Sequence, residues 1–185
     1  MPRVSLACHR TTPCEAVRRI DVDLTLSSAR MLTLQYVLEG DVGLLQIPEV
    51  GVSRRVDKLW QHTCFEAFIA AQDGAGYDEL NFAPSGEWAM YRFHGYREGM
   101  TVVEAAGPDI STRCDAQRLV LEAAVDLKAL HGLGNLAELR LALSAVIEES
   151  TGRLSYWALA HPSSQPDFHH ADSFTLVLDQ PGTPT

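Results

Sequence analysis

One carboxylate interrupts a run of residues that otherwise has the composition of a buried strand. Glu66 lies within the segment from Cys64 to Ile69, where every other side chain is apolar. Because burying a lone carboxylate is costly, Glu66 requires a partner or a ligand. Trp60 supplies a large, flat, apolar surface just before this strand. An aromatic plate beside an anchored carboxylate is typical of a binding face more than of a catalytic centre.

Two catalytic arrangements can be drawn from the same region. Cys64 and His62 would share one face of an extended strand, as a nucleophile and its base do. No third orienting group accompanies them, and an apolar context raises the pKa of a thiol. Glu66 with Asp57 or Glu79 can be drawn as a glycosidase pair, but that mechanism depends on the separation of the two carboxyl groups. The sequence therefore predicts no enzyme activity, with an uncharacterised hydrolase as the weaker alternative.

Histidines and carboxylates gather between His161 and Asp172, and this composition raises the question of a metal site. Zinc requires three or four ligands in tetrahedral geometry, whereas the adjacent His169 and His170 point in different directions on an extended backbone. His161, His169 and His170 are therefore weak metal candidates, and no metal site is predicted. The favoured interpretation is a polar loop at the rim of a pocket, held by hydrogen bonds from side chains to the backbone.

The elements that position these residues are strands. Leu32, Leu34, Tyr36 and Leu38 follow a period-two pattern, and a similar pattern runs from Leu139 to Ile147. Short strands separated by turns indicate an all-β fold, an antiparallel β-sandwich of about ten strands with at most one or two short helices. The predicted strands are Val4 to Cys8, Val22 to Leu26, Leu32 to Leu38, Phe65 to Ala71, Glu79 to Phe82, Trp88 to Phe93, Leu119 to Val125, Leu139 to Ile147, Leu154 to Leu159 and Phe174 to Leu178.

Three further segments complete the predicted architecture. Asp126 to Leu130 is the helix candidate, with the Asp side chain as its cap. The segments Leu44 to Leu59 and Ala160 to Ser173 are rich in Pro, Gly, Ser and charge, and we expect them to form long loops. Binding sites tend to be built from long loops on a rigid scaffold.

Composition predicts one domain and argues against several partners. A chain of 185 residues, 46% of them hydrophobic, can fill one core, so residues 1–179 are expected to form a single domain and residues 180–185 a flexible tail. The net charge is −9 and Lys and Arg are scattered singly, which argues against nucleic acid and anionic membranes. A secretory signal and an apolar stretch of roughly 20 residues are both missing, so we expect a cytoplasmic location. The oligomeric state is left open.

Three segments carry a resemblance to the DOMON-like superfamily: Trp60 to Glu66, Asn81 to Trp88, and Trp157 to Phe174. This superfamily includes the family 9 carbohydrate-binding modules and the haem domain of cellobiose dehydrogenase. The resemblance extends from about Val22 to Leu178. A bacterial stand-alone DOMON-like group is more similar still, over Trp60 to Phe68, Tyr91 to Met100 and Ser155 to Pro162.

The resemblance implies a carbohydrate site on a β-sandwich. In the sugar-binding modules a Trp before a strand and an acidic residue six positions later hold the sugar, and Trp60 and Glu66 reproduce that spacing. A second Trp closes the aromatic clamp, and Trp157 is the available match. Aromatic plates desolvate the apolar face of a sugar ring, while fixed acceptors and Arg donors bind its hydroxyl groups. The other candidate ligand-binding residues are Arg92, Arg97, Asn81, Trp88 and His161, the last in the loop that ends at His170.

Different interpretations of the same residues stay open. Trp60 and Trp88 can instead fill the ends of the sandwich core, with Glu66 paired to Arg92 or Arg97. The same face can also serve as a protein-interaction surface.

A haem or metal protein is a third alternative, because the superfamily includes haem proteins with Met and His axial ligands. Met90, Met100, His94 and His62 are present, but no haem-ligand motif is, and we expect no cofactor. The favoured function is non-catalytic binding of a small carbohydrate or sugar-derived metabolite.

Overall fold

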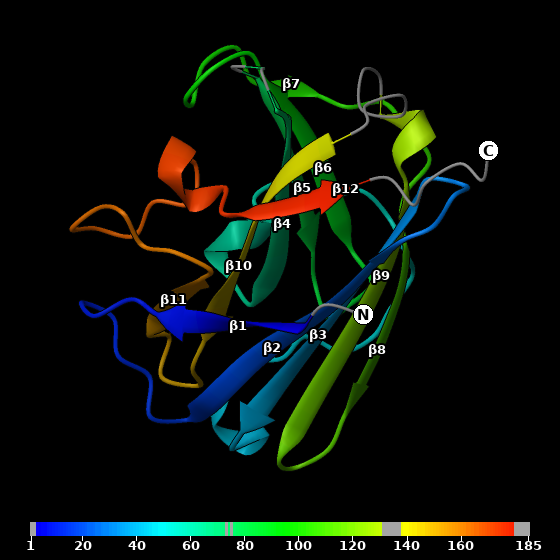
Figure 1. The fold of residues 1–185 in the computed structure, drawn as a ribbon. Helices are drawn as coiled ribbons and strands as arrows, with labels where there is room; N and C mark the ends of the chain where they lie inside the picture. The colour runs from blue at the N-terminus through cyan, green and yellow to red at the C-terminus, as the bar shows by residue number, and fades with distance from the viewer. Residues whose placement is uncertain (1–2, 73, 75, 131–137, 180–185) are drawn as a thin grey trace.

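The structure, a computed structural model, describes residues 3–72, 74, 76–130 and 138–179. Within these residues, twelve strands form one curled antiparallel sheet without an α-helix (Figure 1). The strands are β1 (Arg3–Cys8), β2 (Val17–Leu26), β3 (Met31–Gly40), β4 (Cys64–Ala71), β5 (Tyr77–Phe82), β6 (Trp88–Phe93), β7 (Thr101–Val102), β8 (Asp109–Cys114), β9 (Arg118–Asp126), β10 (Glu138–Glu148), β11 (Leu154–Ala158) and β12 (Leu176–Asp179).

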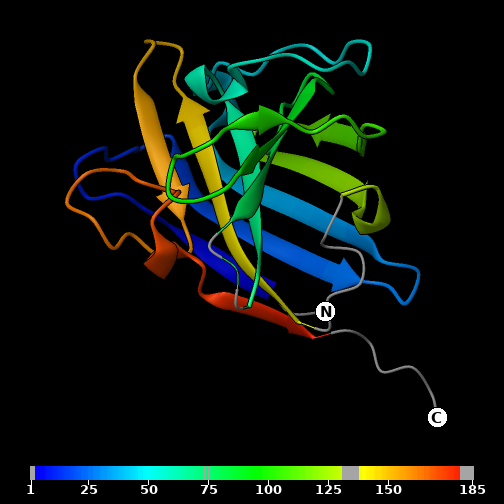
Figure 2. The same ribbon diagram turned by 90° about the horizontal axis from the view of Figure 1, so that it is seen from above.

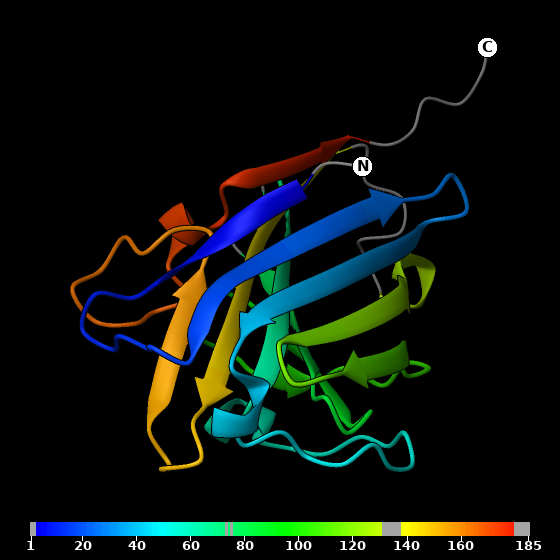
Figure 3. The same cartoon turned by 90° about the horizontal axis from the view of Figure 1, so that it is seen from below.

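The sheet curls into a sandwich because β1 belongs to both of its halves. The strand order is β7-β6-β5-β4-β10-β11-β1-β2-β3-β9-β8, and β12 pairs with β10 beside β11. The segment from Arg3 to Leu6 pairs with β2, whereas Ala7 and Cys8 pair with β11. Figure 3 shows β1, β2, β3, β9 and β8 side by side, and in Figure 2 the strands β4, β10 and β11 cross over β2 and β3.

The main hydrophobic core lies between the two halves. Leu32, Leu34, Tyr36 and Leu38 of β3 are fully buried there, as their alternation predicts. β4 contributes Phe65, Ala67 and Ile69 to the same core, and β10 contributes its odd-numbered residues from 139 to 147. Side chains alternate between the faces of a strand, so the even-numbered residues of β4 and β10 point away from this core.

A second apolar cluster covers the outer face of β4, β5, β6 and β10. Cys64 and Phe68 of β4 belong to it, and Leu59, Phe168 and Phe174 from the connecting segments pack on top. Both faces of β4 are therefore buried, which explains why the strand reads as a continuous apolar run in place of an alternation.

The all-β sandwich prediction is confirmed, with differences in detail. The described residues contain two strands that the sequence did not predict, β7 and β8, and β8 carries polar and exposed residues instead of an apolar alternation. At most one or two short helices were expected, and these residues form four 3₁₀ turns, η1 (Val42–Leu44), η2 (Leu59–Gln61), η3 (Leu127–Ala129) and η4 (Ala171–Ser173).

The helix candidate is the third of these turns, and the Asp126 carboxylate caps it by accepting a hydrogen bond from Lys128 N at 2.9 Å. No helix in the described ranges is long and apolar enough to cross a membrane. The predicted tail, residues 180–185, lies outside the described residues.

Candidate functional site

The outer face of β4, β5, β6, β10 and β11 forms the floor of a cavity of about 430 Å³. Its walls come from η2, from the connection between β6 and β7, and from the connection between β11 and β12. The lining side chains are those of Trp60, Glu66, Glu79, Tyr91, Phe93, Arg97, Met100, Val146, Tyr156, Pro166, Phe168 and His169.

Two carboxylates form the polar part of the floor. Glu66 and Glu79 are 2% and 5% exposed. In the strand register Glu66 pairs with Asn81, so Glu79, two residues before Asn81, is its diagonal neighbour on the same face. Ser144 Oγ donates to Glu66 Oε2 at 3.1 Å, and Asn81 Nδ2 donates to Glu79 Oε1 at 2.8 Å.

Burial favours protonation of both carboxylates, and the charge of Glu79 adds to this effect at Glu66. Burial raises the pKa of Glu66 well above its usual range, and the charge of Glu79 raises it further. The Ser144 hydrogen bond and the charge of Arg97 act in the opposite direction. Burial also raises the pKa of Glu79, against the opposing effects of Asn81 and Arg97. The empty floor therefore favours protonated carboxyl groups, which can accept more hydrogen bonds once they are ionised.

Arg97 brings a positive charge to the cavity from the connection between β6 and β7. Its backbone has φ of 55°, and its N–H donates to the Tyr77 hydroxyl oxygen at 3.2 Å. Arg97 Nη2 lies 3.1 Å from Asp167 Oδ1, and the Tyr96 hydroxyl donates to Asp167 Oδ2 at 2.7 Å. Asp167 thus ties the β6–β7 connection to the β11–β12 connection and holds Arg97 in place.

Aromatic rings line the walls. Trp60 lies in η2, and the residue before this turn, Lys58, adopts the left-handed conformation with φ of 65°. The indole is partly buried and meets the Tyr91 ring edge-on, with ring centres 5.8 Å apart. The Tyr91 hydroxyl donates to Asp57 Oδ1 at 2.6 Å, which fixes the ring. Tyr156 and Phe168 supply a second aromatic pair, with ring centres 6.0 Å apart.

His169 is a neutral member of the wall. Its Nδ1 lies 2.8 Å from the Tyr77 hydroxyl oxygen, and its Nε2 lies 3.8 Å from Glu79 Oε2. Burial lowers the pKa of His169 to about 4, and the charge of Arg97 contributes to this shift. The imidazole is therefore uncharged at neutral pH and presents a polar edge beside the carboxylates.

Among the predicted site residues, the structure brings Trp60, Glu66 and Arg97 together at one cavity. Asn81 lies directly below, fully buried, where it supports Glu79. Trp60 and Glu66 therefore open into a shared space. Arg97 forms its ion pair with Asp167 and not with Glu66.

Trp157 does not form the opposite wall. Its side chain is 5% exposed within the main core, and its Nε1 donates to Ser155 Oγ at 3.1 Å. Neighbouring residues on a strand face opposite ways, so the cavity receives Tyr156 instead.

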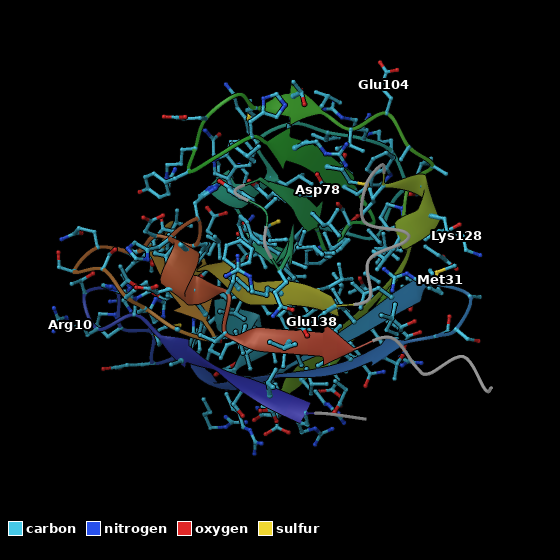
Figure 4. The ribbon with its side chains drawn as sticks, turned by 45° about the horizontal axis from the view of Figure 1, so that its top comes forward. Arg10, Met31, Asp78, Glu104, Lys128 and Glu138 are labelled. Carbon is cyan, nitrogen blue, oxygen red and sulfur yellow. The ribbon has the colours of Figure 1, made fainter. Side chains whose placement is uncertain are left out.

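Arg92 and Trp88 also lie away from the cavity lining. Arg92 donates two hydrogen bonds of 2.7 Å to Asp78, which is 2% exposed and is labelled among the strands in Figure 4. Trp88 packs against the main core, with Gly107 directly against its indole ring. Both side chains lie on the face of β6 that carries Met90, where Trp88 packs and Arg92 forms its ion pair.

The histidines of the predicted polar loop separate in space. His161 Nε2 lies 2.8 Å from the Ala7 carbonyl oxygen and its ring packs on His9, so it faces β1. His170 caps η4 by accepting a hydrogen bond from Asp172 N. Of the three, His169 lines the cavity. Over the described ranges, no group of three or more His, Cys, Asp and Glu side chains is arranged to hold a metal ion.

Cys64 and His62, considered above as a nucleophile and its base, and the methionines considered for haem each have different surroundings. Cys64 is fully buried, and its thiol donates weakly to Asn81 Oδ1 at 3.6 Å. His62 is exposed, with Nδ1 2.7 Å from Glu148 Oε2. For haem, Met90 lies in the main core while Met100 lies at the cavity, so the two methionines face different sides of the sheet.

Most of the residues that line the cavity walls were not predicted from the sequence. Tyr91, Phe93, Tyr156, Phe168 and Met100 were not predicted as ligand-binding residues, although the first two alternate with core residues on β6. Glu79 was considered as a catalytic partner alone. Strand parity is the signal that could have found it, since Glu79 and Asn81 share one face of a strand that also carries buried Leu80.

No family model matches the sequence, and no curated protein matches it either. Solved structures with a similar fold include a Bacteroides uniformis protein provisionally described as carbohydrate-binding. It superposes with a TM-score of 0.69 at 13% identity, over 97% of this chain and 86% of that one.

A family 9 carbohydrate-binding module from Caldicellulosiruptor kristjanssonii also has this fold. In its complex with glucose it matches with a TM-score of 0.50 at 12% identity, over 98% of this chain and 86% of that one. Its complex with cellotriose gives a TM-score of 0.50 at 12% identity, over 98% of this chain and 88% of that one. The chain therefore has a carbohydrate-binding-module-like β-sandwich fold.

Proposed function

We propose that the protein binds a small carbohydrate or sugar-derived metabolite in the cavity at Trp60 and Glu66, without catalysing a reaction. The observation that carries this proposal is that Trp60 and Glu66, predicted from their spacing, line the same cavity. Proteins of the same fold that bind sugars lend support. The DOMON-like assignment, a cytoplasmic location and the lack of a cofactor belong to the same proposal.

The lining suits the two kinds of surface that a sugar presents. Trp60 and Tyr91 offer apolar ring surface to the C–H face of a pyranose. Glu66 and Glu79 accept hydrogen bonds from hydroxyl groups, while the guanidinium of Arg97 donates to hydroxyl oxygens. The volume of about 430 Å³ lies within the usual range for small-molecule sites, which is about 300–1,000 Å³.

The shape of the site favours a small ligand over a protein partner. The carboxylates lie at the bottom of a cavity, where a small ligand can enter, whereas a protein-interaction module needs an extended exposed patch. Glu66 and Glu79 are hydrogen-bonded to Ser144 and Asn81, an arrangement that suits acceptors as well as it suits acids.

Titration calorimetry against a panel of mono- and disaccharides tests the proposal. We expect at least one sugar to bind, and Trp60→Ala to weaken that binding by about tenfold, equivalent to about 1.4 kcal/mol. Val177→Ala is the control, because it truncates an exposed apolar side chain on β12 outside the cavity lining. Absence of heat with every sugar, or equal affinity in the Trp60 variant, would contradict the proposal.

A further inference from the structure

The two buried carboxylates have more acceptor capacity than the protein uses. Each ionised carboxylate offers about four acceptor positions. In the described part of the chain, the Ser144 hydroxyl is the side-chain donor to Glu66, and the Asn81 amide is the side-chain donor to Glu79. Both carboxylates line the cavity, so their remaining acceptor positions are available to a ligand.

Positive charge within the site does not balance this acidity. Arg97 forms its salt bridge with Asp167. Among the described residues, no Arg or Lys forms an ion pair with Glu66, which accepts from Ser144. The basic side chain beside Glu79 is His169, whose Nε2 lies 3.8 Å from Glu79 Oε2 and which is neutral at neutral pH. Ionised carboxylates that are buried without a paired cation are costly, so the empty floor favours protonated carboxyl groups and a cationic ligand can take the place of the proton.

The walls are also suited to a cation. Aromatic faces attract an ammonium group placed over them, and the attraction grows when the group is desolvated. Trp60, Tyr91, Tyr156 and Phe168 stand around the carboxylates. A neutral sugar uses the rings through its C–H face and the carboxylates through its hydroxyl groups. The ammonium group of an amino sugar adds a charge attraction to both.

We infer that the cavity selects a sugar-sized ligand bearing a primary ammonium group, an amino sugar, over the matching neutral sugar. This inference rests on the proposed function and specifies its ligand class. The ammonium group donates its N–H hydrogens to Glu66 and Glu79, and the ring stacks on Trp60.

Ligand binding is then coupled to loss of a proton from the carboxylate pair. Burial and like charge raise the pKa of Glu66, so the empty floor favours a proton that the incoming ammonium displaces. Both carboxylates end ionised, each accepting a hydrogen bond from the ligand. The titratable groups around Glu66 are Tyr36 of β3, Cys64 of β4, Tyr77 and Glu79 of β5, Tyr91 of β6, Tyr156 of β11, and Arg97, Asp167 and His169 of the connections.

Calorimetry with matched sugars tests the inference on the full chain. Each set comprises a hexose, its 2-amino hexosamine and the N-acetylhexosamine, and one set is used for each of the gluco, galacto and manno configurations. The titrations are carried out at mildly acidic pH, where the amine is charged. We expect one hexosamine to bind about tenfold more tightly than its hexose and its N-acetyl form, a factor equivalent to about 1.4 kcal/mol. Titrations in buffers of different ionisation enthalpy should show proton release with the hexosamine and none with the hexose.

The outcomes separate this inference from the proposed function. Trp60-dependent binding with equal affinity for hexosamine and hexose would overturn the inference and leave sugar binding intact. No heat with any member of the panel would overturn both. Glu66→Gln and Glu79→Gln should each reduce the preference for the amine, whereas Glu104→Gln, at an exposed position labelled in Figure 4, should preserve it. The preference measured on the unaltered chain decides the question even if a cavity variant does not fold.

Discussion

Single residues in this protein take their roles from their place in the fold, which is either one face of a strand or a connection between strands. Arg92 and Arg97 were equal candidates from the sequence, yet Arg92 is bound to buried Asp78 while Arg97 reaches the cavity. Trp157 and Tyr156 are adjacent in the chain and lie on opposite faces of β11. Residue type therefore identified the chemistry that was possible. Parity along β11, and for Arg97 a position in the connection after β6, decided which side chain reaches the cavity.

His169 gives a residue-level prediction for stability against pH. Its pKa is about 4 in the folded state and 6.5 without burial, so the unfolded chain binds the proton more tightly. Stability contributed by the neutral imidazole is present above about pH 6.5 and is lost as the pH falls toward about 4. The full loss is about 3 kcal/mol, at about 1.4 kcal/mol per pH unit.

Urea unfolding of the wild type and His169→Gln across this range measures the effect. We expect the advantage of the wild type over the variant to shrink as the pH falls. His170→Gln is the matched control, because it removes the neighbouring imidazole from the same connection, outside the cavity lining. Parallel curves for wild type and His169→Gln would show that the imidazole titrates alike in both states.

At the level of elements, β4 and β10 have the most protected positions. Each pairs on both sides, and both faces of β4 are covered by apolar clusters. β8 lies at the end of the strand order, pairs with β9 alone, and is exposed or partly exposed along its length. Edge strands with exposed backbone open more readily than central ones.

Hydrogen exchange followed by mass spectrometry or NMR checks this difference. Amides of β4 and β10 should exchange slowest, at rates that approach those of global unfolding, and amides of β8 should exchange much faster. A saturating ligand should slow the η2 and β6–β7 segments, since both supply cavity walls. Protection of β8 equal to that of β4 would contradict the assigned strand order.

Across the whole molecule, one side chain links the far half of the sandwich to the site. Tyr36 of β3 is fully buried, and its hydroxyl donates to the backbone carbonyl oxygen of Glu66 at 2.8 Å. The ring also packs on Phe65, with ring centres 5.0 Å apart. The main core therefore supports the strand that carries the carboxylate of the cavity floor.

Tyr36→Phe removes this hydroxyl and keeps the ring, so we expect a loss of about 1–2 kcal/mol in the free energy of unfolding. Tyr96→Phe is the control, because it removes an exposed hydroxyl that binds Asp167, and its loss should be smaller. Urea denaturation of both variants provides the measurement. Equal losses would mean that the buried hydrogen bond between the halves adds no stability.

The sequence by itself determined the sandwich, the central strands and the pair formed by Trp60 and Glu66. A period-two alternation indicates that one face of a strand is buried, and a carboxylate in an apolar run indicates that a polar partner or ligand is needed. Both patterns involve only residues that are close in the sequence. The polar strand β8 could not be predicted from such a pattern, because it pairs with β9 at the edge of the sheet and has no apolar alternation.

Only the tertiary structure decided which side chains share the cavity. Glu79 joins Glu66 through the register of β4 and β5, Arg97 through its tie to Asp167, and Tyr156 through the pairing of β11 with β10. These neighbours lie far apart in the chain. Register and loop packing are set by the molecule as a whole, because every strand must bury its apolar face against partners that no local pattern identifies.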